Sequence, residues 1–253
     1  MRPTPLVLAS CAALALASSA MAATPAPAID PAALQALNRM GAALHSQMTF
    51  VLTADVSDED VLDSGQKLQY AGTLEVRAHR PDRFLISSTS DTRSRKFFYD
   101  GKAVTVFSPK LDMYASFPAP PTIAETLTKA NRDYGIELPL ADLFSWGTDK
   151  TLASRIQSGF FVRPEHIDGR VCNHYAFRQP RVDWQIWIAD DASALPCKLV
   201  ITGRDDPSMP QYTAVLHWSF PATIADTDFN FTPPAGSHRI AFAGDAPTGK
   251  ATP

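Results

Sequence analysis

Asp226-Thr227-Asp228-Phe229-Asn230-Phe231-Thr232-Pro233-Pro234-Ala235-Gly236, near the C-terminus, is the most informative stretch of this chain. Phe229 and Phe231 alternate with polar residues, so both rings are expected on one face of a β-strand. Pro233 and Pro234 cannot donate a ladder hydrogen bond and would end that strand. The sequence therefore predicts a short final strand around residues 229–231.

A second informative stretch lies far upstream, at Arg80-Pro81-Asp82-Arg83-Phe84. One predicted strand ends at Pro81 and another begins at Phe84. Shortly afterwards, apolar segments at residues 96–99 and 103–107 flank Asp100-Gly101, which is a strong β-hairpin signal.

Alternating apolar and polar residues indicate strands along most of the chain. Residues 68–78 alternate cleanly, which is typical of an antiparallel sheet with one apolar face. With the strands above, these segments suggest ten or eleven strands; the others are residues 84–89, 113–117, 160–166, 171–178, 183–188, 198–202 and 212–220.

Two or three helices are also predicted. Asp30 is a suitable N-cap, Pro31 suits the first helical position, and apolar residues follow at helical spacing to residue 48. Thr122 and Glu125 form a capping box for a second helix that ends near Gly135. A short third helix is expected at residues 139–146.

These elements predict a fold that is mainly β with α. Consecutive strands joined by short turns suggest one long meander, and a sheet of about ten strands curls toward a barrel. We expect a half-open β-barrel covered by the helices, as a single domain over residues 30–245. A leader at residues 23–29 and a tail at residues 246–253 would flank it.

The N-terminus has the features of an export signal. Met1-Arg2 is a basic start, residues 6–17 are apolar, and Ala20-Met21-Ala22 fits signal peptidase cleavage before Ala23. The apolar run is too short to span a membrane. Residues 1–22 are therefore interpreted as a cleavable signal peptide and the protein as periplasmic. The alternative is a lipoprotein anchored at Cys11, because Leu8-Ala9-Ser10-Cys11 matches a lipoprotein box.

Charge and composition exclude one class of partner. The 253 residues carry a formal net charge of −3, so no electrostatic attraction to nucleic acid is expected. No apolar run after the signal is long enough to cross a bilayer.

Two cysteines remain after the signal. Cys172 and Cys197 form an even pair in an exported chain, which favours a disulfide. The alternative is two buried thiols that never meet, since sequence does not supply the Cα spacing that a bridge needs.

We find no catalytic motif, and we expect neither an enzyme nor a cofactor. The six histidines lack zinc-motif spacing. Glu165, His166, Asp168 and His174 surround one predicted hairpin and resemble an acid–base set, but exposed polar residues are ordinary beside such a turn. An acidic cluster does not match a calcium loop, and we interpret it as an exposed hairpin tip: Asp55, Asp58, Glu59, Asp60 and Asp63.

Apolar rows on the late strands have two interpretations. Trp184 and Ile186 share one strand face, and Leu216 and Trp218 share another. Such rows form either a filled core or the wall of a cavity with a mouth, and periodicity does not separate the two.

The order of the motifs resembles the LolA/LolB superfamily of lipoprotein carriers, in an uncharacterised periplasmic branch. The matching residues are Arg80-Pro81-Asp82-Arg83-Phe84, then Asp100-Gly101-Lys102 leading to Phe107-Ser108-Pro109, then Phe229 to Gly236. The chain departs from LolA-like sequences in two respects. Leu85-Ile86 stands where a tryptophan is usual, and residues 118–159 form an insert.

The resemblance implies an unclosed barrel with a helical lid and acyl chains inside. In LolA the arginine of the Arg-Pro motif holds the lid closed by hydrogen bonds, so Arg80 is the expected lid latch. The ligand would be a lipid or an acylated protein. Its expected contacts are Leu74, Val76, Phe84, Trp184, Ile186, Leu216, Trp218, Phe229 and Phe231.

The alternative function is an envelope interaction or sensory protein on the same scaffold, which binds a protein partner and no lipid. A basic region is either a solvated strand face or a contact surface for an anionic head group or such a partner. It comprises Arg77, His79, Arg80, Arg83, Arg93, Arg95 and Lys96.

Overall fold

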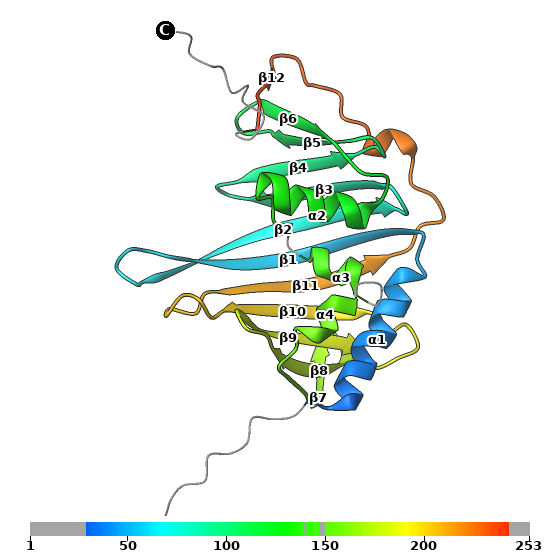
Figure 1. Cartoon of the computed structure of the whole chain (residues 1–253), viewed down its shortest axis with the longest axis vertical. Helices are drawn as coiled ribbons and strands as arrows, with labels where there is room; N and C mark the ends of the chain where they lie inside the picture. Colours follow the sequence, from blue (N-terminus) through cyan, green and yellow to red (C-terminus); the bar gives the residue numbers. More distant parts are fainter. Residues whose placement is uncertain (1–28, 139, 147–149, 243–253) are drawn as a thin grey trace, which may run out of the picture.

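A single twelve-stranded sheet dominates the structure, a computed structural model that describes residues 29–138, 140–146 and 150–242 (Figure 1). The expected signal peptide and tail, and most of the leader, lie outside these residues. The strand order is β12-β6-β5-β4-β3-β2-β1-β11-β10-β9-β8-β7. Within the described chain the two end strands do not pair, so the sheet is curled but open, which confirms the expected fold class.

The sheet consists of two antiparallel meanders. The first contains β1 (Thr49–Val61), β2 (Lys67–His79), β3 (Arg83–Ser90), β4 (Ser94–Tyr99), β5 (Ala103–Ser108) and β6 (Met113–Pro118). The second contains β7 (Ser158–Ile167), β8 (Arg170–Arg178), β9 (Val182–Ala189), β10 (Pro196–Gly203) and β11 (Gln211–Ser219).

The two meanders join at the centre of the sheet, where β1 pairs antiparallel with β11. The prediction of one continuous meander is therefore wrong. After β6 the chain has to travel to β7, at the far edge, before it returns strand by strand to β1. The helical insert makes that crossing, which brings its helices over the sheet.

The four α-helices of the described residues lie over the same face of the sheet (Figure 1): α1 (Pro31–His45), α2 (Ile123–Tyr134), α3 (Ala141–Ser145) and α4 (Lys150–Ser154). Asp30 caps α1 by accepting a hydrogen bond from the Ala32 amide at 2.8 Å. Thr122 caps α2, accepting from the Glu125 amide at 3.3 Å and donating to the Glu125 carboxylate at 2.7 Å. The predicted capping box is confirmed. Gly135, at φ 62°, ends α2 in the left-handed conformation that favours glycine.

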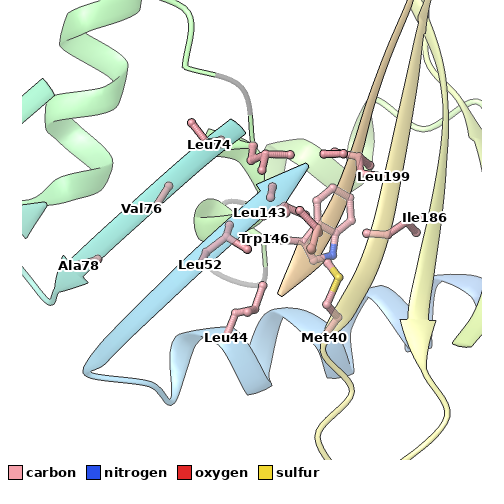
Figure 2. Close-up of a cluster of buried hydrophobic side chains, with 14 of the residues drawn as sticks. Met40, Leu44, Leu52, Leu74, Val76, Ala78, Leu143, Trp146, Ile186 and Leu199 are labelled. Atoms are coloured by element: carbon pink, nitrogen blue, oxygen red, sulfur yellow. The ribbon is translucent and has the colours of Figure 1, made fainter. Parts of the chain in front are cut away.

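The main core lies between the helices and the sheet. Figure 2 shows side chains of both meanders converging on the α3 region, where Leu143 and Trp146 lie between Leu52 and Ile186. Met40 and Leu44 of α1 close the core from the same side as α3. The α1 helix and both meanders thus share one hydrophobic core.

The opposite, outer face of the sheet carries the disulfide. Cys172 of β8 and Cys197 of β10 are bonded across the end of β9, so the predicted pairing is confirmed. Trp187, Ala189 and Val200 pack around the bridge in a smaller outer cluster.

The C-terminal stretch also lies on the outer face, and its predicted strand is wrong. Asp226–Phe229 forms a 3-10 helix, η1, and the last strand is instead β12 (His238–Arg239), which pairs parallel with β6. The Phe231 ring contacts three rings of the first meander, with centroid distances of 5.3 Å to Phe98, 5.4 Å to Phe107 and 5.1 Å to Tyr114. We call residues 226–239 the C-terminal strap.

The acidic cluster is not confined to a hairpin tip. Asp55, Asp58, Glu59 and Asp60 lie within β1, and only Asp63 lies in the turn to β2. The end of this β1–β2 hairpin projects beyond the helical layer (Figure 1), which explains why Tyr70 is 39% exposed although Leu74 is buried.

Loss of the disulfide should destabilise the second meander. The bridge closes a loop with a sequence separation of 25 residues, and constraining such a loop in the unfolded chain typically contributes about 2–4 kcal/mol. We expect reduction to lower the free energy of unfolding by that amount in urea denaturation. The Cys172→Ala/Cys197→Ala double variant should have the lower stability and no response to reductant; a reductant effect that persists in it would contradict this explanation.

The aromatic anchor of the strap should also matter for stability. Phe231→Ala removes a half-buried ring from a four-ring cluster, and we expect a loss of roughly 1–3 kcal/mol, below the value for a fully buried phenylalanine. Phe160→Ala is the matched control, because Phe160 is 43% exposed. If both variants lose the same free energy of unfolding, Phe231 stabilises the protein no more than an exposed ring does.

Candidate functional site

An apolar pocket lies between the first meander and the helices above it. Its walls are Phe50, Val76, Ala78, Arg80, Phe84 and Ile86 from the sheet side, and Ile123, Leu127, Leu138 and Ala141 from the helical side. The pocket contains about 410 Å³ of space, part of it open to solvent. Its enclosed interior has room for little more than one water molecule, so the helices hold it nearly closed.

Among the described residues of the pocket wall, Arg80 alone is charged. Its Nε and Nη2 atoms are buried, and neither has a hydrogen-bond partner in the part of the chain that the structure describes. The guanidinium lies 5.9 Å from the centroid of the Phe50 ring. Burial lowers the pKa of Arg80 from its ordinary value, but an arginine remains protonated in proteins. The pocket wall therefore contains a partly buried positive charge with two buried, unused donors.

The backbone around Arg80 is held from two sides. The Arg80 amide donates to the Met48 carbonyl at 2.8 Å, and the Pro81 carbonyl accepts from the Ile123 amide at 2.8 Å. The Arg80–Pro81 peptide is cis. This turn thus connects the start of β1, the end of β2 and the first residue of α2.

The hydrogen bonds expected of a lid latch are not formed by these two donors. Arg80 lies beneath α2 and α3, yet Nε and Nη2 have no acceptor on the described helical residues. A latch role for Arg80 stays a prediction.

Two tryptophans in the same core have similarly unused donors. Trp146 and Trp184 pack edge to face, with centroids 5.9 Å apart, and the Trp184 ring stacks on Phe177 at 4.4 Å. The indole Nε1 atoms of Trp146 and Trp184 are buried, and neither has an acceptor among the described residues. Buried donors without partners are uncommon in proteins, and here three residues under the helices have them.

The predicted ligand contacts fall into three groups. Val76 and Phe84 line the pocket. Leu74, Ile186 and Leu216 are buried in the surrounding core, and Trp184 and Trp218 are partly buried against it. Phe229 and Phe231 belong to the strap on the outer face, away from the helices.

Several pocket residues were not predicted from sequence. Phe50 belongs to the alternation Phe50, Leu52, Ala54 in β1, a short signal that is obscured by the acidic residues that follow it. Ile123 and Leu127 are four residues apart on α2, the spacing of one helix face, so this signal was available. The contribution of Leu138 and Ala141 depends on the path of the connection after α2, which sequence does not specify.

The Glu165 and His174 pair does come together, but on the outer face. The Glu165 carboxylate accepts hydrogen bonds from Trp187 and Arg163, both at 2.8 Å, which lowers the pKa of Glu165. His174 stacks on Trp187 at 3.9 Å, and its Nδ1 is 3.6 Å from Glu165, beyond hydrogen-bond range. These groups stabilise the β7–β9 surface, and their arrangement gives no reason to assign catalysis.

The described residues contain no group of three or more His, Cys, Asp or Glu side chains that could hold a metal ion. None of their helices has the length and apolar character needed to cross a membrane.

Removing the buried charge should stabilise the protein without ligand. Arg80→Met eliminates two unsatisfied donors, whose desolvation costs about 1–3 kcal/mol, and loses a cation–π contact of about 0.5–1 kcal/mol. We expect the free energy of unfolding to rise by roughly 1–2 kcal/mol in urea denaturation.

The matched control is Arg83→Met, three residues away. Arg83 is half-exposed and forms an ion pair with Asp226 at 3.2 Å, so its loss should leave stability unchanged or slightly lower. A clear loss of stability in Arg80→Met would show that its donors are satisfied in solution.

Comparison with known proteins identifies the family and gives several distant structural similarities. Lipoprotein LppX of Mycobacterium tuberculosis shares 14% identity over 78% of this chain and 100% of that chain, with a TM-score of 0.49. The LolA superfamily protein NE2245 of Nitrosomonas europaea shares 11% over 79% of this chain and 97% of that chain, with a TM-score of 0.37.

A chain of the Pseudomonas aeruginosa MucA/MucB complex shares 15% identity over 79% of this chain, with a TM-score of 0.36. The present chain spans 61% of its length. These similarities are too distant to transfer a function. The comparison with curated proteins gives no match. Residues 33–243 match the family described as "Predicted periplasmic protein (DUF2092)", and the chain belongs to that family.

Proposed function

We propose that this protein is a periplasmic carrier or binding protein for a hydrophobic ligand, a lipid or an acylated protein. The observation that carries the proposal is the pocket under α2 and α3, whose wall is apolar apart from Arg80. Removing an acyl chain from water contributes roughly 0.8 kcal/mol per buried methylene. A chain of moderate length thus supplies enough free energy for binding.

The nearly closed pocket requires that the helices move when a chain enters. The α2 helix presents Ile123 and Leu127 to the pocket, while Ala124, Glu125 and Thr128 are exposed on its other side. Its N-terminal end is held by the Ile123 amide, which bonds to Pro81, and by Thr126, which donates to the Pro120 carbonyl at 3.3 Å. At its C-terminal end the Tyr134 ring stacks on Phe117 of β6, with centroids 4.3 Å apart. Separation of α2 from the sheet would open the pocket and would have to break this ring contact.

The first contacts of the chain would be Val76 and Phe84. As the helices move away, the chain would extend over the neighbouring core residues Leu74, Ile186 and Leu216, with Trp184 and Trp218 at its border. In this role Arg80 would respond to opening, because its turn is bonded to α2.

The alternative is an envelope protein that binds a polypeptide partner and no lipid. The feature that favours it is β7, the last strand of the sheet, where Phe160, Phe161 and Val162 are 43%, 43% and 39% exposed. Along most of its length β7 pairs only with β8 within the described residues. An edge of this kind suits pairing with an extended segment of another protein.

Native mass spectrometry of the protein purified from the periplasm, followed by organic extraction, separates these functions. We expect a reproducible bound lipid or acylated species. Leu127→Trp should reduce its occupancy severalfold, because the larger ring fills the pocket from a half-buried helix position. Ala124→Trp, on the exposed side of the same helix, should retain it.

A protein that is free of ligand and takes up neither fatty acids nor lipopeptides would contradict the carrier function and leave the polypeptide partner. Equal occupancy in the Leu127→Trp and Ala124→Trp variants would place the ligand somewhere other than this pocket.

A further inference from the structure

We propose that Arg80 is the receptor for the head group of the ligand, and that the ligand is a single-chain amphiphile with a carboxylate head. This inference rests on the proposed function and names the chemical class of the ligand. It differs from a latch role, in which the guanidinium would bind the protein's own helices.

The unused donors of Arg80 have the geometry of an anion site. Nε and Nη2 are the two atoms along one edge of the guanidinium, and their N–H groups point in parallel. Such an edge binds the two oxygens of a carboxylate or phosphate at once. Both atoms are buried in the pocket wall, so bulk water does not compete for a hydrogen bond to them.

The surroundings of Arg80 favour a negative charge on the head group of the ligand. Burial alone accounts for the lowered pKa of Arg80, with no contribution from an acidic neighbour. The nearby arginines differ: Arg77 pairs with Asp228 and Arg83 with Asp226, both at 3.2 Å. These two bind the strap on the outer face, whereas the Arg80 charge is left for another partner. A buried unpaired charge is costly, so an anionic head is favoured over a neutral or cationic one.

The size of the site favours a carboxylate. Apart from Arg80 the pocket wall is apolar, the Phe50 ring lies 5.9 Å from the guanidinium, and the enclosed space is small. A planar two-oxygen head needs no donor beyond the Arg80 edge. A phosphate has further oxygens, which this apolar wall would leave without partners.

The position of Arg80 is also suited to hold the head while the chain moves. Its backbone is fixed to Met48 on one side and, through Pro81, to Ile123 on the other. The head would therefore bind near the N-terminal end of α2, with the chain running beneath the helix toward Leu127 and Leu138.

The test compares ligands that share one chain and differ in the head. Binding of dodecanoate, dodecanol and dodecyl phosphate is measured by calorimetry at a pH where the acid is ionised. The wild-type protein should bind dodecanoate about ten- to a hundredfold more tightly than dodecanol, as expected for hydrogen bonds to charged groups. Dodecyl phosphate should bind less tightly than dodecanoate.

Variants then assign the preference to Arg80. Arg80→Met should lose the preference for the acid over the alcohol, whatever its absolute affinity for either ligand. Arg80→Lys keeps the charge without the two-donor edge and should show a reduced preference. Arg83→Met is the control and should keep the full preference, because Arg83 lies outside the pocket wall.

The outcomes separate this inference from the proposed function. Equal affinity for acid and alcohol in the wild type, or a preference that survives in Arg80→Met, overturns the role of Arg80 while the pocket stands. Tighter binding of dodecyl phosphate overturns the choice of carboxylate. If none of the three ligands binds to the folded wild type, the proposed function fails, and this inference with it.

Discussion

Pairing of β1 with β11 is the constraint on which the rest of the structure depends. The two strands are far apart in sequence, yet Val51–Asp58 of β1 lie opposite Tyr212–Ser219 of β11 in an unbroken register. Because this pairing occupies the inner edge of each meander, β6 and β7 are forced toward opposite ends of the sheet. The segment that joins them must cross a face, and in doing so it supplies the helices of the site.

The crossing also makes the two faces of the sheet chemically different. On the helical side, apolar residues of both meanders share one core with α1 and the α3 region. On the outer side, stability comes from separate local devices: the disulfide on the second meander and the C-terminal strap on the first. The disulfide and the strap both act on the face opposite the helices. The stability that they give to the outer face therefore does not depend on the position of α2.

The helical side, by contrast, contains most of the unsatisfied polar groups. Arg80, Trp146 and Trp184 each have a buried donor without a described partner, and all three lie where the helices meet the sheet. A sheet face optimised only for stability would replace such groups with apolar side chains of similar size. Under the proposed function these donors are retained for binding rather than for stability.

Much of the fold could be predicted because local signals agreed with tertiary structure. The Asp100-Gly101 turn, the capping box at Thr122 and the alternation of residues 74–78 each specify an element without reference to distant contacts. The strap shows the opposite case. Two phenylalanines spaced by one residue are typical of a strand. In the structure, however, Phe229 is buried at the end of a 3-10 helix, and Phe231 packs against three rings of the first meander. Only the folded first meander creates the surface that decides this conformation.

The site was predictable to a similar, partial extent. Val76 and Phe84 follow from strand alternation, and Arg80 from its motif, because those features are local. Whether the Arg80 side chain has a hydrogen-bond partner depends on its three-dimensional surroundings, and the hydropathy pattern of the sequence does not contain that information. The pattern also does not show on which face of the sheet the strap lies. The strap lies on the outer face, so Phe229 and Phe231 are separated from the pocket by the sheet.

The location of the charge has a consequence for how binding and opening are connected. If Arg80 were on α2 itself, neutralising it would act on the moving part directly. It lies instead at the turn before β3, bonded to Met48 and, through Pro81, to Ile123. Under the proposed function, an anion bound there would compensate the charge in both the open and the closed arrangement, whereas the apolar chain would be shielded from water only when the helices close over it. The head would therefore select the ligand by charge, and the chain length would set how strongly the closed arrangement is favoured.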